Sequence, residues 1–336
     1  MADAKVTIYQ VAARAGVSAA TVSRVMNGAR VSPESERRVR AAAAELAFTP
    51  NRTARRLRRQ YSEVIALIIP DIENPFFTAL ARGVENRARA GGFSVVLCNT
   101  DDDPARESTY MDIAIAEHMA GVILAPADAT SDVSRLIAHR RPVVAVDRSL
   151  NRADIDAVTV DNRAGGLSAA ESLFAAGFSR VACITGPSSV ETAQLRMEGW
   201  QQASRDRHGA GDDELLRHDE LLRYADYRVD GGRAAMAELL ALREPPDAAV
   251  VANNLMAAGA IEALHDAGLA PPGFGLAVFG DLPFASFGRR GIRVVDLPAR
   301  KLGEAAAGLL LDRIAGDDGP ARTVVLRADR RSREKQ

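Results

Sequence analysis

The stretch AATVSRVMN, residues 19–27, combines small side chains with hydrogen-bonding ones and contains no acid. On a helix its exposed positions are expected to be Ala19, Ala20, Thr21, Ser23, Arg24 and Asn27. Small residues let a helix approach base edges in the major groove of DNA, and an arginine can donate two hydrogen bonds to guanine. Hydroxyl and amide groups can hold phosphates. The stretch therefore favours a nucleic-acid surface, although a three-helix module of this kind can also bind proteins.

The residues on either side predict the helices that would position this stretch. Apolar residues at helical spacing over residues 8–15 predict a first short helix. Gly16 permits a sharp turn, and Ser18 is a good N-cap for the helix that carries the stretch. A third helix is expected to begin at Ser32 and Pro33. Two short helices joined through a glycine turn form a helix-turn-helix.

The segment NRTARRLRRQYS, residues 51–62, carries five arginines and no acid. The whole chain has a formal net charge of -1, whereas residues 1–60 hold 12 basic and 4 acidic side chains. A small basic module thus precedes a larger acidic one. Asn51 can cap a short helix with Ala54 and Leu57 on one side and arginines around the rest. Such a helix becomes favourable beside a polyanion, but without the preceding helix-turn-helix a solvated basic linker would be the better interpretation.

From residue 62 onward, continuous apolar runs alternate with amphipathic helical stretches. The first run is VIALIIP at residues 64–70, and a repeat of the same pattern ends with LAVFG at residues 276–280. Runs of this kind are typical of parallel strands covered by helices on both faces. The sequence therefore predicts an α/β core of two doubly wound parallel sheets. Ligands of such sheets bind at the carboxyl ends of the strands, so the cleft between the sheets is the expected site.

Polar and aromatic side chains gather at these expected strand ends. Carboxylates and amides accept hydrogen bonds from hydroxyl groups, arginines donate to oxygens, and aromatic faces cover the C–H face of a sugar ring. The candidates for binding a small effector are Asn74, Phe76, Phe77, Asp147, Arg148, Arg196, Tyr227, Asn253 and Asp281. Alternatives stay open, because either phenylalanine can belong to the core, Asp71 can cap a turn, and an isolated arginine can form an ion pair between lobes.

Catalytic and membrane functions find little support in the sequence. The five histidines form no i,i+4 metal-binding pair, and neither a phosphate-loop lysine motif nor a nucleophile elbow is present. Cys98 and Cys183 lie far apart in apolar runs, as expected of buried reduced thiols. No apolar run is long enough to span a bilayer, and the first residues lack the apolar core of a signal peptide. We expect no enzyme activity, no metal, no cofactor and a cytoplasmic location.

Two long segments, TIYQVAARAGVSAATVSRVMNG and VSPESERRVRAAAAELAFTPNRTARRL, resemble the DNA-binding headpiece and hinge of the LacI family of bacterial transcriptional regulators. The resemblance continues along nearly the whole chain. It implies that Ala19, Ala20 and Arg24 read bases. It implies phosphate contacts for Ser18, Thr21, Ser23 and Asn27.

The resemblance also gives the arginine-rich segment a role. In the family, a hinge helix pairs with its twin in a dimer, lies in the minor groove and inserts a leucine into the central base step, and the matching residue here is Leu57. An apolar wedge of this kind kinks the duplex. The hinge residues expected to bind DNA are Asn51, Arg52, Ala54 and Leu57.

Three parts of the chain follow from the resemblance. They are a helix-turn-helix headpiece over residues 1–50, a hinge helix and linker over 51–61, and a periplasmic-binding-protein-like effector core over 62–336. The first lobe of the core is expected at about 62–158 plus 293–320, and the second at about 159–292 plus 321–330. The late strand near IRVVDLP is thus expected to return to the first lobe.

The function implied is that of a sequence-specific regulator, a repressor, which binds a near-palindromic double-stranded operator as a homodimer. A small sugar or sugar derivative, a monosaccharide or a simple derivative of one, would control operator affinity from the cleft. The alternatives are a sugar receptor that does not bind DNA, and a regulator that answers to a purine or a phosphoprotein. The sequence does not decide whether the effector releases DNA or promotes binding. Two positions depart from the family pattern: Asn253-Asn254 replaces a common Asn-Asp, and Leu297 replaces a frequent glutamine.

Overall fold

A computed structural model describes residues 6–26, 31–46, 48, 62–209, 219–281 and 291–330 of the chain. It consists of two compact units, Met1–Tyr61 and Ser62–Gln336, and each is described by itself. The predicted hinge residues, and Asn27 of the headpiece, lie outside the described residues.

The headpiece contains three short helices, α1 (Ile8–Ala15), α2 (Ala19–Met26) and α3 (Pro33–Glu45). Thr7 caps α1 in a capping box with Gln10, which satisfies backbone groups at both positions. Gly16 ends α1 with φ at 63°, a left-handed conformation that glycine adopts without steric cost. Fully buried valines from all three helices meet in one small core. The predicted helix-turn-helix is therefore present.

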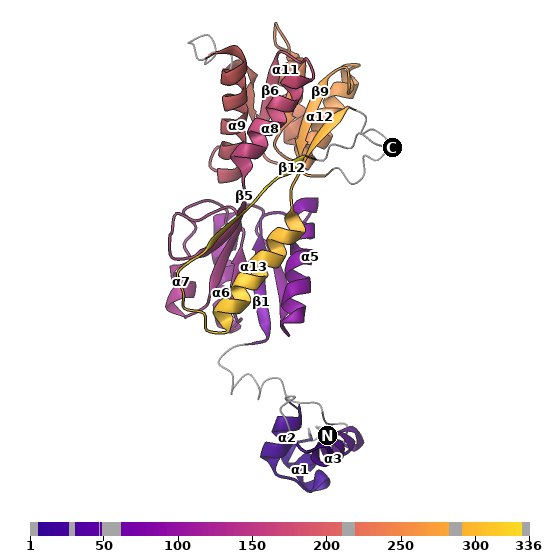
Figure 1. The fold of residues 1–336 in the computed structure, drawn as a ribbon, viewed down its shortest axis with the longest axis vertical. Coiled ribbons are helices and arrows are strands. Elements are labelled where there is room, and N and C mark those ends of the chain that lie inside the picture. The colour runs from indigo at the N-terminus through magenta and orange to yellow at the C-terminus, as the bar shows by residue number, and fades with distance from the viewer. Residues whose placement is uncertain are drawn as a thin grey trace. The chain divides into compact units, whose positions relative to one another are not determined.

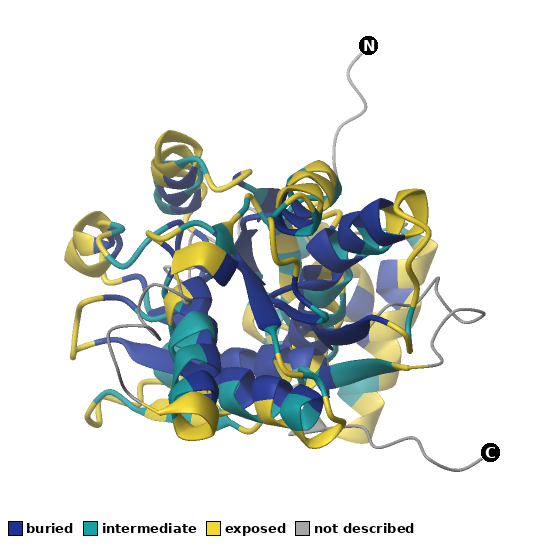
Figure 2. Ribbon diagram, turned by 90° about the horizontal axis from the view of Figure 1, so that it is seen from above, coloured by how far each residue is buried: buried dark blue, intermediate teal, exposed yellow. Residues whose placement is uncertain are grey.

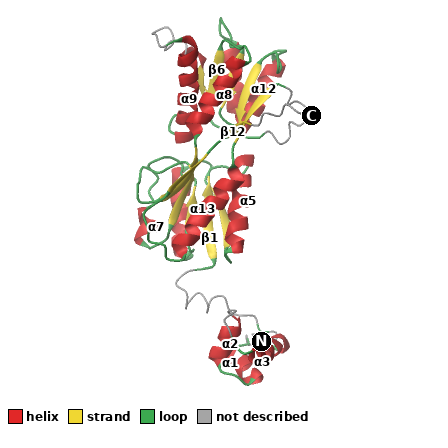
Figure 3. Ribbon diagram, in the orientation of Figure 1, coloured by secondary structure: helices red, strands yellow, loops and turns green. Residues whose placement is uncertain are grey.

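The first lobe of the core is built on a six-stranded parallel sheet in the order β11-β5-β4-β3-β1-β2 (Figures 1 and 3). Its strands are β1 (Val64–Ile69), β2 (Ser94–Asn99), β3 (Val122–Leu124), β4 (Val143–Asp147), β5 (Asp156–Val160) and β11 (Thr323–Leu326). Its helices are α5 (Pro75–Ala90), α6 (Pro104–Ala116), α7 (Ser134–Ala138) and α13 (Ala299–Ile314).

Alternation along β1 shows how this sheet is covered on both faces. Ile65, Leu67 and Ile69 pack in a core with residues of α5 and α13, whereas Ala66 and Ile68 pack in a second core with residues of α6 and α7. A strand with both faces buried needs an unbroken apolar run, which is the pattern of residues 64–69. Figure 2 shows buried strands between helices whose outer surfaces are exposed.

The second lobe has the strand order β12-β10-β9-β8-β6-β7. Its parallel strands are β6 (Val181–Thr185), β7 (Leu222–Tyr224), β8 (Ala248–Val251), β9 (Gly275–Phe279) and β10 (Ile292–Asp296), and β12 (Asp329–Arg330) pairs antiparallel with β10. Its helices are α8 (Asn162–Ala175), α9 (Glu191–His208), α11 (Val229–Leu240) and α12 (Asn254–Asp266). Two doubly wound sheets were predicted, and the structure confirms them. Within the described ranges, no helix is long and apolar enough to cross a membrane.

The assignment of the late segments to lobes was partly wrong. Strand β10, expected in the first lobe, pairs with β9 in the second, with Ile292 beside Leu276. The return comes directly after it, because α13 packs on α5 of the first lobe. Strand β11, expected in the second lobe, pairs with β5 in the first. An apolar run predicts a buried strand but carries no information about which of two similar sheets will accept it.

Candidate functional site

Helix α2 presents the headpiece residues that were predicted to contact DNA. Ser18, Ala20 and Arg24 are exposed, and Thr21 and Ser23 are half-buried. Ala19 is half-buried because it packs against the headpiece core. Ser18 accepts a hydrogen bond from the backbone N–H of Thr21 at 3.1 Å and so begins the helix as expected.

One exposed aromatic of the headpiece was missed. Tyr9 on α1 is 74% exposed, although its ring is large and apolar. Its position in the apolar-periodic stretch of residues 8–15 suggested only a helix. A single exposed aromatic is common on protein surfaces, so its exposure alone assigns Tyr9 no role.

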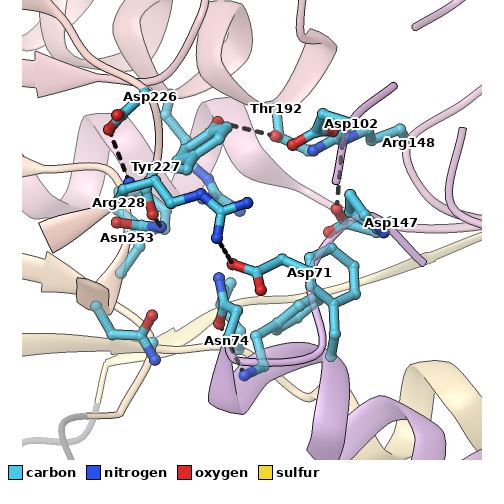
Figure 4. A pocket seen from close by; sticks show the side chains of 18 residues that line it. Asp71, Asn74, Asp102, Asp147, Arg148, Thr192, Asp226, Tyr227, Arg228 and Asn253 are labelled. Carbon is cyan, nitrogen blue, oxygen red and sulfur yellow. Dashed lines mark hydrogen bonds and ion pairs between the residues drawn. The ribbon is translucent and has the colours of Figure 1, made fainter. Parts of the chain in front are cut away.

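The two lobes of the core enclose a cleft of about 550 Å³, part of which is open to solvent. Residues from the carboxyl ends of strands in both sheets line it, as Figure 4 shows. Eight of the nine predicted effector residues are among them: Asn74, Phe76, Phe77, Asp147, Arg148, Arg196, Tyr227 and Asn253. Asp281 does not line the cleft, since its exposed side chain lies beyond the end of β9 and its backbone oxygen accepts from Asn254 Nδ2 at 3.1 Å.

Asp147 ends β4, Arg148 follows it directly, and the two form the most buried charged pair in the cleft. Arg148 Nη1 donates to Asp102 Oδ1 at 2.7 Å and to the backbone oxygens of Pro126 and Ala127. Its Nε is buried without a hydrogen-bond partner, 3.9 Å from Asp147 Oδ2. Burial lowers the pKa of Arg148, but the neighbouring carboxylates outweigh this and raise the pKa overall. Asp102 is thus a functional candidate that the sequence reasoning missed.

The carboxylate of Asp147 is held in an unusual state. Its side chain belongs to a residue that is 5% exposed, and no described residue donates a hydrogen bond to it. Burial raises its pKa above the usual value, against the opposing effect of Arg148 and Arg196. Its backbone has φ at 68°, which a non-glycine residue adopts at some cost. The fold therefore presents a desolvated hydrogen-bond acceptor to the cleft.

Arg196 is positioned by close contact between α8 and α9. A Cβ on Gly166 would lie 2.1 Å from the Arg196 backbone oxygen, so only glycine permits this approach. Arg196 Nε donates to Asn162 Oδ1 at 2.8 Å and Nη1 donates to the Ala252 oxygen at 2.5 Å. The guanidinium also lies 4.5 Å from the ring centroid of Phe279, in a cation–π contact. Burial lowers the pKa of this arginine.

Tyr227 also has left-handed backbone, with φ at 63°, as do Asp102 and Asp147 in the same cleft. Its hydroxyl lies 3.2 Å from Thr192 Oγ1, and its ring packs on Gly186, where an added Cβ would fall 2.1 Å from ring carbon Cζ. Burial raises the pKa of the Tyr227 hydroxyl. Strained backbone in a bulky residue is characteristic of functional sites, where surrounding contacts hold it in place.

The two predicted amides also serve as helix caps. Asn74 Oδ1 accepts from the backbone N–H of Phe76 at 3.0 Å, and Asn253 Oδ1 accepts from that of Met256 at 2.8 Å. Asn253 Nδ2 also donates to the backbone oxygen of Tyr227. Phe76 and Phe77 meet edge to face at 5.0 Å between ring centroids. Phe77 packs in the first-lobe core and also lines the cleft, so its expected place in the core is confirmed and its effector contact stays a prediction.

Ion pairs and hydrogen bonds join the two lobes beside the cleft. Arg228 Nη1 lies 3.5 Å from Asp71 Oδ2, and its Nη2 lies 3.8 Å from Asp101 Oδ1. Glu191 of the second lobe accepts from the backbone and the hydroxyl of Ser149 at 2.6 and 2.5 Å. The sequence suggested such pairs only in general terms, because they join turns whose geometry is set by the fold.

Other lining residues were also missed as candidates. They are Pro70, Asp71, Asp102, Thr192, Asp226, Arg228, Asn254, Phe279, Gly280 and Leu297. Most lie at or shortly after a strand end, which is the signal that could have found them, whereas Thr192 lies in the first turn of α9. Among the residues that the structure describes, no group of histidine, cysteine, aspartate and glutamate is arranged to hold a metal ion.

Known proteins match both units of the chain. Residues 7–51 match a family model described as bacterial regulatory proteins, lacI family, and residues 62–330 match one described as periplasmic binding proteins and sugar binding domain of LacI family. The ribose operon repressor of Escherichia coli (strain K12) is 35% identical over 314 residues, which cover 92% of this chain and 93% of that protein.

Solved structures match over the same length. A complex of the transcriptional regulator CelR with cellobiose is 28% identical, with a TM-score of 0.72, and the match covers 97% of this chain and 98% of that chain. The lac repressor dimer bound to operator and the anti-inducer ONPF is 26% identical, with a TM-score of 0.81 and the same coverage. These matches confirm the predicted resemblance and fold, and the chain belongs to the lacI family of bacterial regulatory proteins.

Proposed function

We propose that this regulator is a repressor that binds a near-palindromic operator as a homodimer, and that a monosaccharide in the cleft sets its operator affinity. The observation that carries the effector half is the Asp147 carboxylate, which is buried, lines the cleft and receives no hydrogen bond from a described residue. A desolvated carboxylate is costly unless a donor reaches it. The hydroxyl groups of a sugar are such donors.

The groups around Asp147 support a polyhydroxylated ligand. A hydroxyl that donates to Asp147 can accept from the neighbouring Arg148, whose Nε has no other partner. Arg196 has two of its nitrogens engaged with Asn162 and Ala252, so the planar group is fixed before a ligand enters. Groups held in place in this way lose little freedom on binding, which favours affinity and specificity.

The contacts between lobes supply a route from effector to operator. Arg228 to Asp71 and Glu191 to Ser149 hold the lobes together beside the cleft. A ligand that touches both lobes biases their relative position, and a shift of the lobes in a dimer changes the spacing of two headpieces. Operator half-sites have a fixed spacing, so the spacing of the two headpieces controls the affinity for operator DNA.

A purine is the second candidate, because Phe76 and Phe77 offer aromatic surface to a planar ring. The carboxylates that line the cleft, Asp71, Asp102, Asp147 and Asp226, favour a ligand with several hydroxyl donors over a heterocycle with mostly acceptors. A binding test that includes both sugars and purines distinguishes the two kinds of ligand.

Thermal unfolding of the full-length chain against pentoses, hexoses and purines tests the proposal. A bound sugar raises the melting temperature of the native state by mass action. Asp147→Asn should remove this rise, whereas Asp266→Asn, which alters a surface carboxylate paired with Arg233, should keep it. Gel shifts with operator DNA should then change when the same sugar is added. A rise with purines alone, or a parental response from Asp147→Asn, would contradict the proposal.

A further inference from the structure

The polarity of the cleft changes along the second sheet. The carboxyl ends of its parallel strands follow the order β10, β9, β8, β6 and β7. Leu297 follows β10, and Phe279 ends β9. Asp226 and Arg228 follow β7 at the opposite edge of the same sheet, where Figure 4 shows Arg228 reaching toward Asp71. One end of the cleft is therefore apolar and the other is charged.

The backbone groups that the structure describes beside Leu297 are already engaged. Gly280 has no side chain, and its N–H donates to the Val295 oxygen at 2.9 Å. The Leu297 oxygen accepts from the N–H of Ala299 at 2.8 Å. Asn254 Nδ2 donates to the Asp281 oxygen. A ligand hydroxyl placed beside Leu297 would thus lose its water without gaining a partner from the leucine side chain or from these backbone groups.

Leu297 is held firmly in this place. Its half-buried side chain packs against the cores of both lobes, at the point where the chain leaves β10 for α13. Phe279 is almost fully buried, and the Arg196 guanidinium covers its ring. The surface that Leu297 offers to the ligand is consequently hydrocarbon that the cores of both lobes hold in place.

We propose that the effector is a deoxy sugar, with a methyl or methylene group facing Leu297 in place of one hydroxyl. This inference rests on the proposed function, because it assumes that a monosaccharide fills the cleft. The hydroxyls of the sugar meet Asp147 and Arg148, and its deoxygenated carbon meets Leu297. Leu297 is then the residue that determines specificity.

Matched pairs of sugars test the inference in the full-length chain. Each pair differs in one hydroxyl: L-fucose and L-galactose, L-rhamnose and L-mannose, D-fucose and D-galactose, 2-deoxy-D-ribose and D-ribose. Thermal shift finds the pair that binds, and calorimetry then measures both members. We expect the deoxy member to bind about 10- to 100-fold tighter, because the other buries an unpaired hydroxyl.

Variants of Leu297 then assign the preference to this side chain. Leu297→Gln has similar size and adds a donor and an acceptor, so it should reverse or abolish the ratio of the two affinities. Leu297→Met keeps an apolar surface and should preserve that ratio, which separates specificity from packing. Leu269→Gln, a change at an exposed leucine after α12, is the matched control and should leave the ratio unchanged.

The possible outcomes separate this inference from the proposed function. If a hydroxylated sugar binds at least as tightly as its deoxy partner, the inference is wrong and the proposed function stands. The inference also fails if Leu297→Gln keeps the parental ratio. If no sugar binds and a purine or nucleoside does, both are overturned.

Discussion

On α2 of the headpiece the candidate residues Ala20 and Arg24 are exposed, whereas most candidates in the cleft of the core are buried and several bond to neighbouring groups. Arg24 is exposed, while Arg196 is 5% exposed and donates to two neighbouring groups. An exposed arginine gains most of its interaction energy only when a binding partner such as DNA arrives. A buried arginine already stabilises the folded state. Arginine-to-alanine substitution should therefore lower folding stability in the core and DNA affinity in the headpiece.

The largest effect is expected from Arg196→Ala. This change leaves the acceptors on Asn162 and Ala252 unpaired and opens space over Phe279. We expect it to lower the free energy of unfolding of the core by about 3–5 kcal/mol. Urea denaturation measures this, with Arg82→Ala, an exposed arginine 3.7 Å from Glu85, as the control within about 0.5 kcal/mol. Equal losses in the two variants would remove the distinction between buried and exposed arginines.

A smaller effect is expected from Gly186→Ala. The new methyl would overlap the Tyr227 ring, which must move away from Thr192. Overpacking of this kind costs about 1–3 kcal/mol, and effector affinity should fall with it. Gly308→Ala is the control, because its methyl would meet nothing closer than 3.8 Å. Unaltered effector binding in Gly186→Ala would show that the Tyr227 position is unimportant.

Substitution of an exposed arginine in the headpiece should change DNA binding and leave stability unaltered. Arg24→Ala should leave the stability of the headpiece unchanged and weaken binding to the preferred operator by about 1–3 kcal/mol, with little change on random DNA. Competition between operator and random DNA measures the affinity for each. Arg40→Ala removes an exposed arginine paired with Glu36 on α3 and serves as control. An equal loss on random DNA would mean that Arg24 contacts only phosphate.

The smallest effect concerns the stability of the core as a function of pH. Because the pKa of Asp147 is raised in the folded chain, its charged form opposes folding above that pKa and the penalty disappears as the pH falls. Asp147→Asn should therefore raise the melting temperature at neutral pH and lose this advantage in acid. Effector affinity of the parent should fall as the pH is lowered, since the protonated carboxyl accepts poorly. A pH-independent difference would contradict the raised pKa.

The strand ends were predictable because the sequence marks them directly. Asp147 and Asn253 follow unbroken apolar runs, and parallel strands bring such positions to one edge. The lobe that accepts β10 was not predictable, because strand pairing depends on neighbours far away in the sequence. The contacts of Asp102 and Arg228 were missed for a similar reason: their partners lie 46 residues away for Asp102 and across the cleft for Arg228.

Three segments of chain run between the lobes, from β5 to α8, from β10 to α13 and from β11 to β12. The two lobes are thus joined by three neighbouring connecting segments. Such a linkage resists sliding and separation more than it resists bending, so hinge rotation is its softest motion. A ligand that contacts both lobes therefore acts mainly on the angle between them.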